Sequence, residues 1–536
     1  MRCPCFTGNS MAPGVATSNR GNVFCERWLW MCFALVFMLK FLLVPMYHST
    51  DFEVHRNWMA ITYNLPMRQW YYENTSEWTL DYPPIFAYFE LTLAEVAKIV
   101  VPDALIIQKE QFTSPQLLLF QRFSVILCDF IYVIANGFLA NSIILSKENS
   151  KRSAVGCCIL LICNASLILV DNIHFQYNAI LTAILLFSVA FTMRGQLLVA
   201  ASLFCLLLNM KHIYAYYALA YVIFYLYAYI FASFDRFVVS RIVKLAIATW
   251  IPFFVSFGPF LYVGGAKMFA QILSRLFPFQ RGLTHAYWAP NLWAIYNFVD
   301  LGLYRTLKVL NRLPSNVQSP QYTSGLVQQY SHSILPSVNA LTALMMTLLL
   351  LSPLIASLFM KRRRNFMLLL THAAFAFFLA GYHVHEKAIL LVTIPYTILA
   401  ATDHRFLSSF VVLSAIANIS LFPLFFTPFE NIIKVSMAFC YHFLAECITK
   451  FICVEQSTMS ALQKCCLIGV LLVQTYCLIL HKVLFYSRFE YVPLMLTSVS
   501  AAIVMLLLFV ELLWKGYSTR PQHCRCFRLE GKFKRS

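Results

Sequence analysis

The chain has 536 residues, of which 60% are hydrophobic and only 12% are charged, and its mean hydropathy is +0.68. A soluble protein of this length needs far more charge to cover its surface, so the composition excludes a soluble globular protein and predicts an all-α polytopic membrane protein. The net charge of +18 is carried by short loops and by the C-terminal tail. Nucleic-acid binding is therefore not expected.

The predicted elements start with an N-terminal tail at 1–27 and a first span at 28–46. This span is long enough to remain in the membrane as a signal anchor. A polar first loop follows at 47–117. Its segment at 85–101 is apolar but charged, and we expect it to lie at the membrane interface rather than to cross.

Later spans fill the rest of a membrane domain at 28–514, which ends in a basic tail at 515–536. A second long loop is expected at 264–332. The pattern predicts about fourteen transmembrane helices in all. The later spans are predicted at 118–145, 154–171, 178–193, 196–210, 213–233, 244–263, 334–359, 366–382, 387–402, 405–425, 430–452, 464–484 and 492–514.

Lysine and arginine are concentrated in the loops on one side of the predicted domain. By the positive-inside rule this side is cytosolic, so both termini are predicted to be cytosolic and both long loops lumenal. If 85–101 crossed the membrane, every later basic loop would face outward. The triplet Asn74-Thr75-Ser76 in the first loop predicts N-glycosylation at Asn74. The basic loops lie at 147–152, 194, 235–244, 361–364, 403–405 and 515–535.

Unusual polar residues are predicted to converge at the lumenal side. Taken singly, a His or Lys at the end of a span is more often an anchor that reaches the interface than a ligand. Several such clusters on one side favour a polar site, because ionisable groups at membrane depth are costly and are usually retained for function. The clusters are Asp51, Glu53, His55 and Arg56; Asp171, His174, Gln176 and Asn178; Lys211 and His212; Arg275 and Arg281; and His383, His385, Glu386 and Lys387.

A carboxylate near the membrane surface, several cations and no nucleophile–base pair fit a displacement on a lipid-phosphate sugar. The phosphate leaves as an anion that Lys, Arg or His can stabilise, and Asp or Glu can accept the proton of the incoming hydroxyl. A two-carboxylate glycosidase built on Asp51 and Asp81 is an alternative, but hydrolysis would not need a frame of membrane spans. A metal site is not expected, because His383 and His385 would point to different faces of a helix.

Three runs in these loops, at 49–58, 80–84 and 384–387, resemble the dolichyl-phosphate-glucose-dependent glucosyltransferases of the endoplasmic reticulum. The resemblance implies a GT-C membrane fold, a lumenal active site, an inverting mechanism, and no metal or other cofactor. It also implies residence in the endoplasmic reticulum membrane. Dolichyl phosphate glucose would be the donor, and a dolichyl-diphosphate oligosaccharide the acceptor.

The same resemblance implies roles for individual residues. Asp51 matches the position of the general base, and Asp81 matches a second loop aspartate, expected to bind the acceptor or to shape the loop. The donor phosphate would lie near 383–387 and Arg281. Substrate contacts are expected from Glu53, Arg56, Asp81, Tyr82, His174, Lys211, His212, Arg281, His383, His385, Glu386 and Lys387.

Residues 77–80, 281–283 and 287–291 look most like the family member that adds the second glucose, in α-1,3 linkage, to Glc1Man9GlcNAc2-PP-dolichol. The related enzyme that adds the first glucose to Man9GlcNAc2-PP-dolichol is the alternative. A transporter, in which the same charges would line a pathway, and a non-catalytic subunit are further alternatives. The sequence has no clear internal repeat, which argues against a transporter, and Asp51 argues against a non-catalytic subunit.

Overall fold

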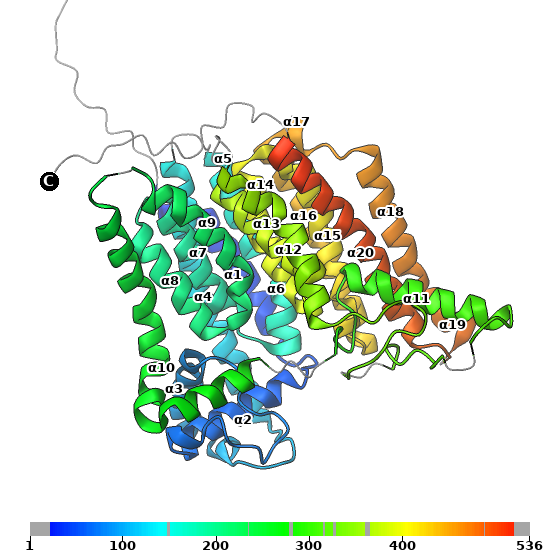
Figure 1. Ribbon diagram of the computed structural model, residues 1–536, viewed down its shortest axis with the longest axis horizontal. Helices are drawn as coiled ribbons and strands as arrows, with labels where there is room; N and C mark the ends of the chain where they lie inside the picture. Colours follow the sequence, from blue (N-terminus) through cyan, green and yellow to red (C-terminus); the bar gives the residue numbers. More distant parts are fainter. Residues whose placement is uncertain are drawn as a thin grey trace, which may run out of the picture.

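The chain folds into a bundle of helices that lie side by side, with α2 and α3 across one end (Figure 1). The computed structural model describes residues 22–146, 151–233, 235–277, 282–314, 317–324, 328–359, 365–486 and 488–518. These residues contain no β-strand, and a single isolated bridge joins Thr284 to Val384. The all-helical prediction is therefore confirmed for this part of the chain.

The bounds of the helices follow the chain in order. They are α1 (Arg27–Leu42), α2 (Asp51–Asn64), α3 (Pro84–Val100), α4 (Pro115–Leu145), α5 (Lys151–Ile162), α6 (Ala165–Ile168), α7 (Asn178–Met193), α8 (Leu197–Met210), α9 (Ala218–Tyr225), α10 (Val238–Leu276), α11 (Leu292–Val309), α12 (Ala340–Ala356), α13 (Phe366–Ala380), α14 (Leu390–Thr402), α15 (Leu407–Ser420), α16 (Pro428–Ile452), α17 (Val454–Ser457), α18 (Ala461–Thr475), α19 (His481–Phe485) and α20 (Tyr491–Leu513).

Within the described residues, nine helical segments are long and apolar enough to cross a membrane, and α7, α8 and α13 are shorter apolar helices. The protein is thus a multi-pass membrane protein, while the predicted number of about fourteen spans stays a prediction. The nine segments are Pro115–Leu145, Lys151–Phe175, His212–Ile230, Val238–Leu276, Ala340–Phe359, His404–Leu424, Pro428–Ile452, Ala461–Phe485 and Tyr491–Tyr517.

Helix starts are set by local capping chemistry. Ser114 accepts the backbone N–H of Leu117 at 3.0 Å, and Pro115, which has no N–H to leave unpaired, is the first residue of α4. Pro84 likewise begins α3, directly after Pro83. The two prolines after Tyr82 therefore separate the polar part of the first loop from a helix.

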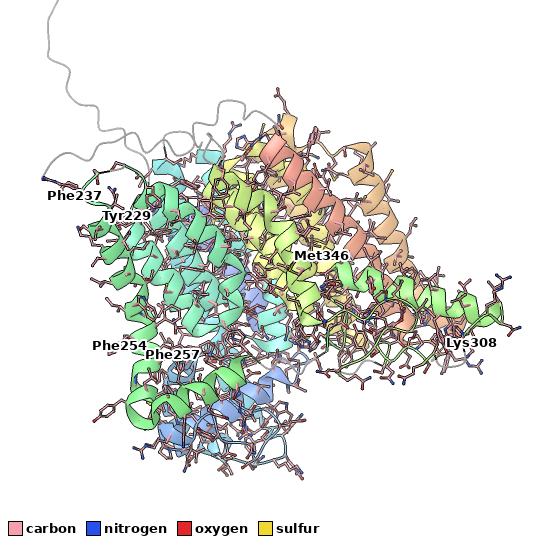
Figure 2. All side chains as sticks on the ribbon, in the orientation of Figure 1. Tyr229, Phe237, Phe254, Phe257, Lys308 and Met346 are labelled. Carbon is pink, nitrogen blue, oxygen red and sulfur yellow. The ribbon has the colours of Figure 1, made fainter. Side chains whose placement is uncertain are left out.

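The bundle has a buried centre and an apolar rim. The segment that contains α15 is entirely buried over its apolar window, whereas the corresponding window of α10 is only 6% buried. Phe254 of α10 points away from the bundle (Figure 2), and 77% of its surface is exposed. Such an apolar outer surface fits contact with lipid chains.

The first loop forms a cap over one end of the bundle. Helix α10 bends at Gly265, whose φ of 61° is readily adopted only by glycine, and its last turns run beneath the bundle towards the first loop (Figure 1). There Gln271 and Arg275 both donate hydrogen bonds to the carbonyl oxygen of Tyr71, at 2.9 and 3.1 Å. Helix α3 lies across the bundle end, as expected of an interfacial helix.

A buried ion pair fixes the helix that leads into the first loop. Lys40 near the end of α1 donates to Asp129 of α4 at 2.7 Å, and both side chains are almost completely buried. Breaking such a pair would leave an uncompensated charge in an apolar setting. The pair therefore holds α1 against α4 just before the chain reaches the start of α2.

Candidate functional site

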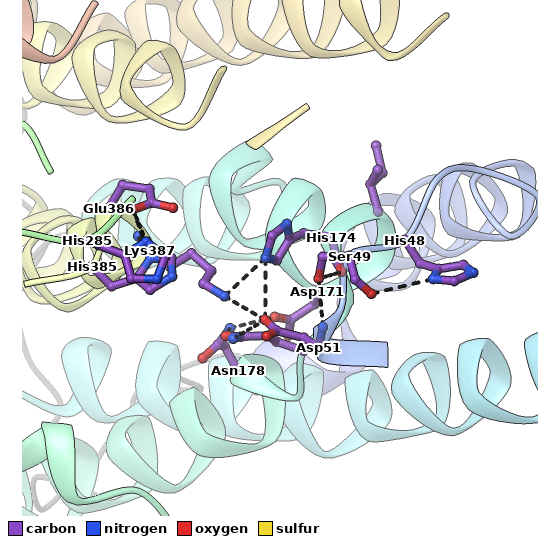
Figure 3. A network of polar contacts seen from close by, with 12 residues as sticks. His48, Ser49, Asp51, Asp171, His174, Asn178, His285, His385, Glu386 and Lys387 are labelled. Atoms are coloured by element: carbon purple, nitrogen blue, oxygen red, sulfur yellow. Dashed lines mark hydrogen bonds and ion pairs between the residues drawn. The ribbon is translucent and has the colours of Figure 1, made fainter. Parts of the chain in front are cut away.

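Asp51 is the first residue of α2, and its carboxylate is the centre of a polar network at the capped end of the bundle (Figure 3). One oxygen, Oδ2, accepts hydrogen bonds from Lys387 Nζ at 2.6 Å and from Gln176 Nε2 at 2.8 Å. The Nε2 atom of His174 lies 3.4 Å from the same oxygen. Among the described residues all these contacts fall on Oδ2, so Oδ1 keeps its acceptor capacity for a ligand.

The side chains of His174 and Gln176 reach Asp51 from an irregular turn. Residues Leu169–Phe175 form the π-helical turn η4, a conformation that is common at functional sites. Phe175 has a φ of +85°, which is unfavourable for a residue with a side chain, and it is completely buried. Its packing against Phe52 and His55 of α2 holds this strained turn in place.

A second cation extends the network away from Asp51. Lys211, which follows α8, donates to Asn178 Oδ1 at 3.2 Å and to Gln176 Oε1 at 3.4 Å. Burial, and then the charge of Lys387, lower the pKa of Lys211 to about 8. Its ammonium group also lies 5.0 Å from the ring centre of Tyr82, within cation–π range.

The charge of Asp51 depends on its neighbours. Burial by itself would raise the pKa of its carboxyl group, but the charge of Lys387 and the hydrogen bond and charge of His174 outweigh burial. The pKa of Asp51 is therefore held well below its usual value. The carboxylate is ionised at neutral pH and can accept a proton, although in this pairing it is a weak base.

Arg122 ties together the two segments that carry Asp51 and His174. Its guanidinium donates to the carbonyl oxygens of Met46 and Tyr47 at 3.2 and 2.9 Å, just before Asp51. It also donates to the carbonyl oxygens of Asn172 and Ile173 at 2.7 and 3.0 Å, just before His174. The side chain is 2% exposed. We refer to Arg122 and these four carbonyl groups as the Arg122 clamp.

Two further contacts support the same junction. Both the N–H and the hydroxyl of Ser49 donate to the carbonyl oxygen of His174, at 3.0 and 2.6 Å. The N–H of Tyr47 donates to Glu430 of α16 at 3.0 Å. Segments that lie far apart in the chain are thus held at hydrogen-bond distance around the Asp51 carboxylate.

His285, His385 and Glu386 form a second cluster, which Lys387 joins to Asp51 (Figure 3). The two imidazole rings lie 3.9 Å apart, and Nδ1 of His385 is 3.0 Å from a Glu386 oxygen. Burial, followed by the charge of Lys387, lowers the pKa of His385 well below its usual value. Burial, followed by the charge of His385, lowers the pKa of His285 to about 3.

The ligand atoms of this second cluster lie within 4.8 Å of one another, close enough to surround a metal ion. The spacing argument against a metal compared His383 with His385, whereas the structure groups His385 with Glu386 and with His285 from another loop. His383 instead hydrogen-bonds the Gly282 carbonyl oxygen at 2.7 Å. The absence of a metal stays a prediction.

The predicted site residues fall into two groups. Asp51, His174, Lys211 and Lys387 share one hydrogen-bonded network, and Tyr82 contacts it through Lys211. The charge of Asp81 also acts on the titration of Lys211. His383, His385 and Glu386 lie in the adjoining segment, and the ring of His212 packs against Phe277 at 5.2 Å.

Glu53 and Arg56 are engaged within the first loop itself. They pair with each other, and Arg56, which is fully buried, donates to the carbonyl oxygens of Ala104 and Ile106 at 3.2 and 2.6 Å. Glu53 accepts the N–H of Phe112 at 3.2 Å. These contacts give the pair a structural role, and its contact with substrate stays a prediction. Arg281 and the tails at 1–21 and 519–536 lie outside the described residues.

Comparison with known proteins identifies the family. The sequence profile described as "ALG6, ALG8 glycosyltransferase family" matches residues 36–512, most of the chain. The chain belongs to this family. Like the other members of the ALG6, ALG8 family, it is a polytopic glycosyltransferase of the GT-C type.

Individual relatives are similar over most of this ALG6, ALG8 family chain. A Caenorhabditis elegans protein named dolichyl pyrophosphate Glc1Man9GlcNAc2 alpha-1,3-glucosyltransferase is 43% identical over 90% of this chain, which spans 64% of the nematode protein's length. A Mus musculus protein of the same name is 40% identical, with 87% of this chain and 91% of the mouse protein covered. A Drosophila melanogaster protein named as a probable enzyme of this kind is 39% identical, with 90% and 93% covered.

Sequence reasoning missed several residues that build this family member's site. Arg122 lies in a predicted span, so a charged group at membrane depth was the available signal. His285 gave no signal, because it meets His385 and Glu386 only through the bridge between residues Thr284 and Val384. Glu430 gave none either, since its contact with Tyr47 joins residues 383 positions apart.

Proposed function

We propose that this protein transfers glucose from dolichyl phosphate β-glucose to Glc1Man9GlcNAc2-PP-dolichol. The reaction adds the second glucose, in α-1,3 linkage and with inversion at the anomeric carbon, during assembly of the lipid-linked oligosaccharide for N-glycosylation. The names of the relatives support this acceptor, and they do not favour the first-glucose enzyme. Membership of a glycosyltransferase family likewise speaks against a transporter.

The observation that carries the chemistry is the ionised Asp51 carboxylate, held 2.6 Å from Lys387 at the end of the bundle. Asp51 accepts the proton of the acceptor hydroxyl while the hydroxyl oxygen bonds to the anomeric carbon of the donor glucose. The bond between that carbon and the phosphate oxygen breaks, and its electron pair leaves with dolichyl phosphate. One displacement of this kind inverts the anomeric centre.

Negative charge builds up on the leaving phosphate during this step. Lys387 is the cation next to Asp51, and the imidazoles of His385 and His285 lie beside it, each about one-quarter exposed (27% and 25%). Lys211 adds a further positive charge on the other side of Asp51. We assign the donor phosphate to the space next to Lys387, whose fixed positive charge stabilises the charge as it develops, with the neutral imidazoles beside it as hydrogen-bond donors.

We further propose that the site faces the lumen of the endoplasmic reticulum and that both termini are cytosolic. Basic residues belong to helix ends at the opposite end of the bundle, where α10 begins and α20 ends (Figure 1), and they support this orientation by the positive-inside rule. They include Arg194 after α7, Arg241 in the first turn of α10, Arg405 before α15 and Lys515 after α20. Asn74 lies at the capped end in an irregular segment and is exposed, as a glycosylation acceptor must be.

A direct test offers purified protein dolichyl phosphate glucose together with either glucose-free or monoglucosylated lipid-linked oligosaccharide. Mass spectrometry of the product then shows which acceptor gains a hexose. We expect a gain on the monoglucosylated acceptor only. Transfer to the glucose-free acceptor would instead identify the first-glucose activity, and transfer to neither would contradict the proposed function.

A further inference from the structure

The carboxylate that we propose as the general base is already paired with a cation. Lys387 Nζ donates to Asp51 Oδ2 at 2.6 Å and lies 3.1 Å from His174 Nε2, and its side chain is only 10% exposed. A carboxylate that already accepts a charge-assisted hydrogen bond has a reduced tendency to take a further proton. The same ammonium group that completes the network around Asp51 thus weakens the base that the reaction needs.

Lys387 is also the cation nearest to the space assigned to the donor phosphate. It directly follows His385 and Glu386 in the chain, and it links that cluster to Asp51 (Figure 3). An ammonium group has three hydrogen-bond donors, of which the Asp51 contact uses one and the His174 contact at most one more. A phosphate can therefore engage a remaining hydrogen without first displacing either contact.

We propose that donor binding unmasks the base: the donor phosphate draws Lys387 away from Asp51, and the freed carboxylate then receives the acceptor hydroxyl. The inference rests on the proposed function and extends it to the order of events. The proton still passes from the acceptor hydroxyl to Asp51, and the carbon–oxygen electron pair leaves with the phosphate. Lys387 changes only its partner, from a carboxylate to a phosphate oxygen.

The groups that face Asp51 explain why the loss of Lys387 changes its basicity. They are Lys387 from the segment before α14, His174 from η4 with Gln176 directly after it, and Lys211 from the turn after α8. Tyr47, Tyr82 and His385 also lie close enough to interact with its charge. Burial is the largest influence on the Asp51 carboxyl and raises its pKa, whereas Lys387 is the strongest influence in the opposite direction. Pairing Lys387 with phosphate removes the strongest influence that lowers this pKa and so makes Asp51 a stronger base.

Donor and acceptor binding must then be coupled, and the coupling is reciprocal. The test measures binding of the monoglucosylated acceptor to full-length protein in nanodiscs, with and without dolichyl phosphate as the phosphate probe. We expect dolichyl phosphate to tighten acceptor binding about tenfold, within the usual range for coupled sites. The same affinity with and without the probe overturns the inference.

The variant Lys387→Met tests whether Lys387 is responsible for the coupling between donor and acceptor binding. In the variant the coupling is lost, and Lys98→Met, which removes an exposed lysine of α3, should behave as the wild type. A second readout is the pH dependence of kcat/KM for the acceptor at saturating donor. Its acidic limb is the pH range in which activity falls because Asp51 becomes protonated. If Lys387 has left Asp51, this limb lies at the same pH in the wild type and in Lys387→Met. A limb at clearly lower pH in the wild type would show that Lys387 stays on Asp51.

These results also separate the inference from the proposed function. A wild-type protein that transfers no glucose to the monoglucosylated acceptor contradicts the function. Normal transfer without coupling contradicts only the unmasking step. If Lys387→Met does not fold, the wild-type binding measurement alone decides the question.

Discussion

At the residue scale, the properties of the site depend on the balance of charges around the Asp51 carboxylate. Asp51 combines a position at a helix N-terminus, which favours an anion, with a cation at 2.6 Å and an acceptor oxygen left over. This arrangement holds a partly exposed carboxylate ionised and still leaves it able to receive a proton. The neighbours of Asp51 therefore matter as much as Asp51 itself.

Replacing the base tests this view. We expect Asp51→Asn to lower glucose transfer by about 10²- to 10⁴-fold, the usual contribution of a general base, because an amide cannot accept the hydroxyl proton. Transfer from dolichyl phosphate glucose is the measurement, and the melting temperature of the purified variant controls for folding. Near-normal transfer by a folded Asp51→Asn protein would reject Asp51 as the base.

At the element scale the Arg122 clamp fixes the register between the start of α2 and η4. The first turns of α4 supply the guanidinium, and the two segments supply two carbonyl oxygens each. The hydrogen bonds from Ser49 to the His174 carbonyl oxygen join the same two segments. A rigid five-donor group from a third element therefore sets how Asp51 and His174 meet.

We expect Arg122→Lys to place Asp51 and His174 incorrectly while keeping the positive charge, since a lysine cannot reach four carbonyl groups at once. The predicted result is a fall in kcat of about tenfold or more, because small misplacements of reacting groups are costly, with a smaller change in donor KM.

The matched control is Arg241→Lys, which lies at the other end of the bundle and bonds Ile230, Ser233 and Asp235. Steady-state kinetics and melting curves of both variants provide the readout. Equal effects on kcat from the two substitutions would show that the Arg122 clamp only stabilises the fold and does not position Asp51 and His174.

At the scale of the whole molecule, one end of the bundle carries the chemistry and the other carries the basic loops. The cap made by α2, α3 and the bent end of α10 closes the first end (Figure 1). An apolar rim surrounds the bundle between the two ends. This division predicts which loops of the chain are accessible to N-glycosylation in the lumen.

Glycosylation tests the division. We expect Asn74 to be glycosylated, because it is exposed at the capped end, so glycosidase treatment should shift the mass of the wild type but not of Asn74→Gln. Asn418 carries a similar triplet inside α15 and is completely buried, so Asn418→Gln should leave the shift unchanged. A glycosidase shift that persists in Asn74→Gln would assign the glycan elsewhere.

Much of the fold could be predicted from the sequence, because apolar stretches of membrane length can adopt few structures other than a helix. The predicted boundary between a span at 244–263 and the second long loop lies next to the bend at Gly265, and the segment predicted at 85–101 forms α3. The boundaries were less accurate: the span predicted from residue 334 begins as α12 at Ala340, where Asn339 caps the helix. Capping depends on single polar residues, which a hydropathy pattern averages out.

The sequence alone determined that the protein is an all-helical membrane protein and that Asp51, His174, Lys211 and Lys387 belong to one polar region. Hydropathy and charge act along the chain, so their pattern is visible in one dimension. Only the tertiary structure decided that Lys387 pairs with Asp51, that Arg122 joins two segments, and that His285 meets Glu386. Those contacts link residues tens to hundreds of positions apart, and their distances are set by packing in three dimensions.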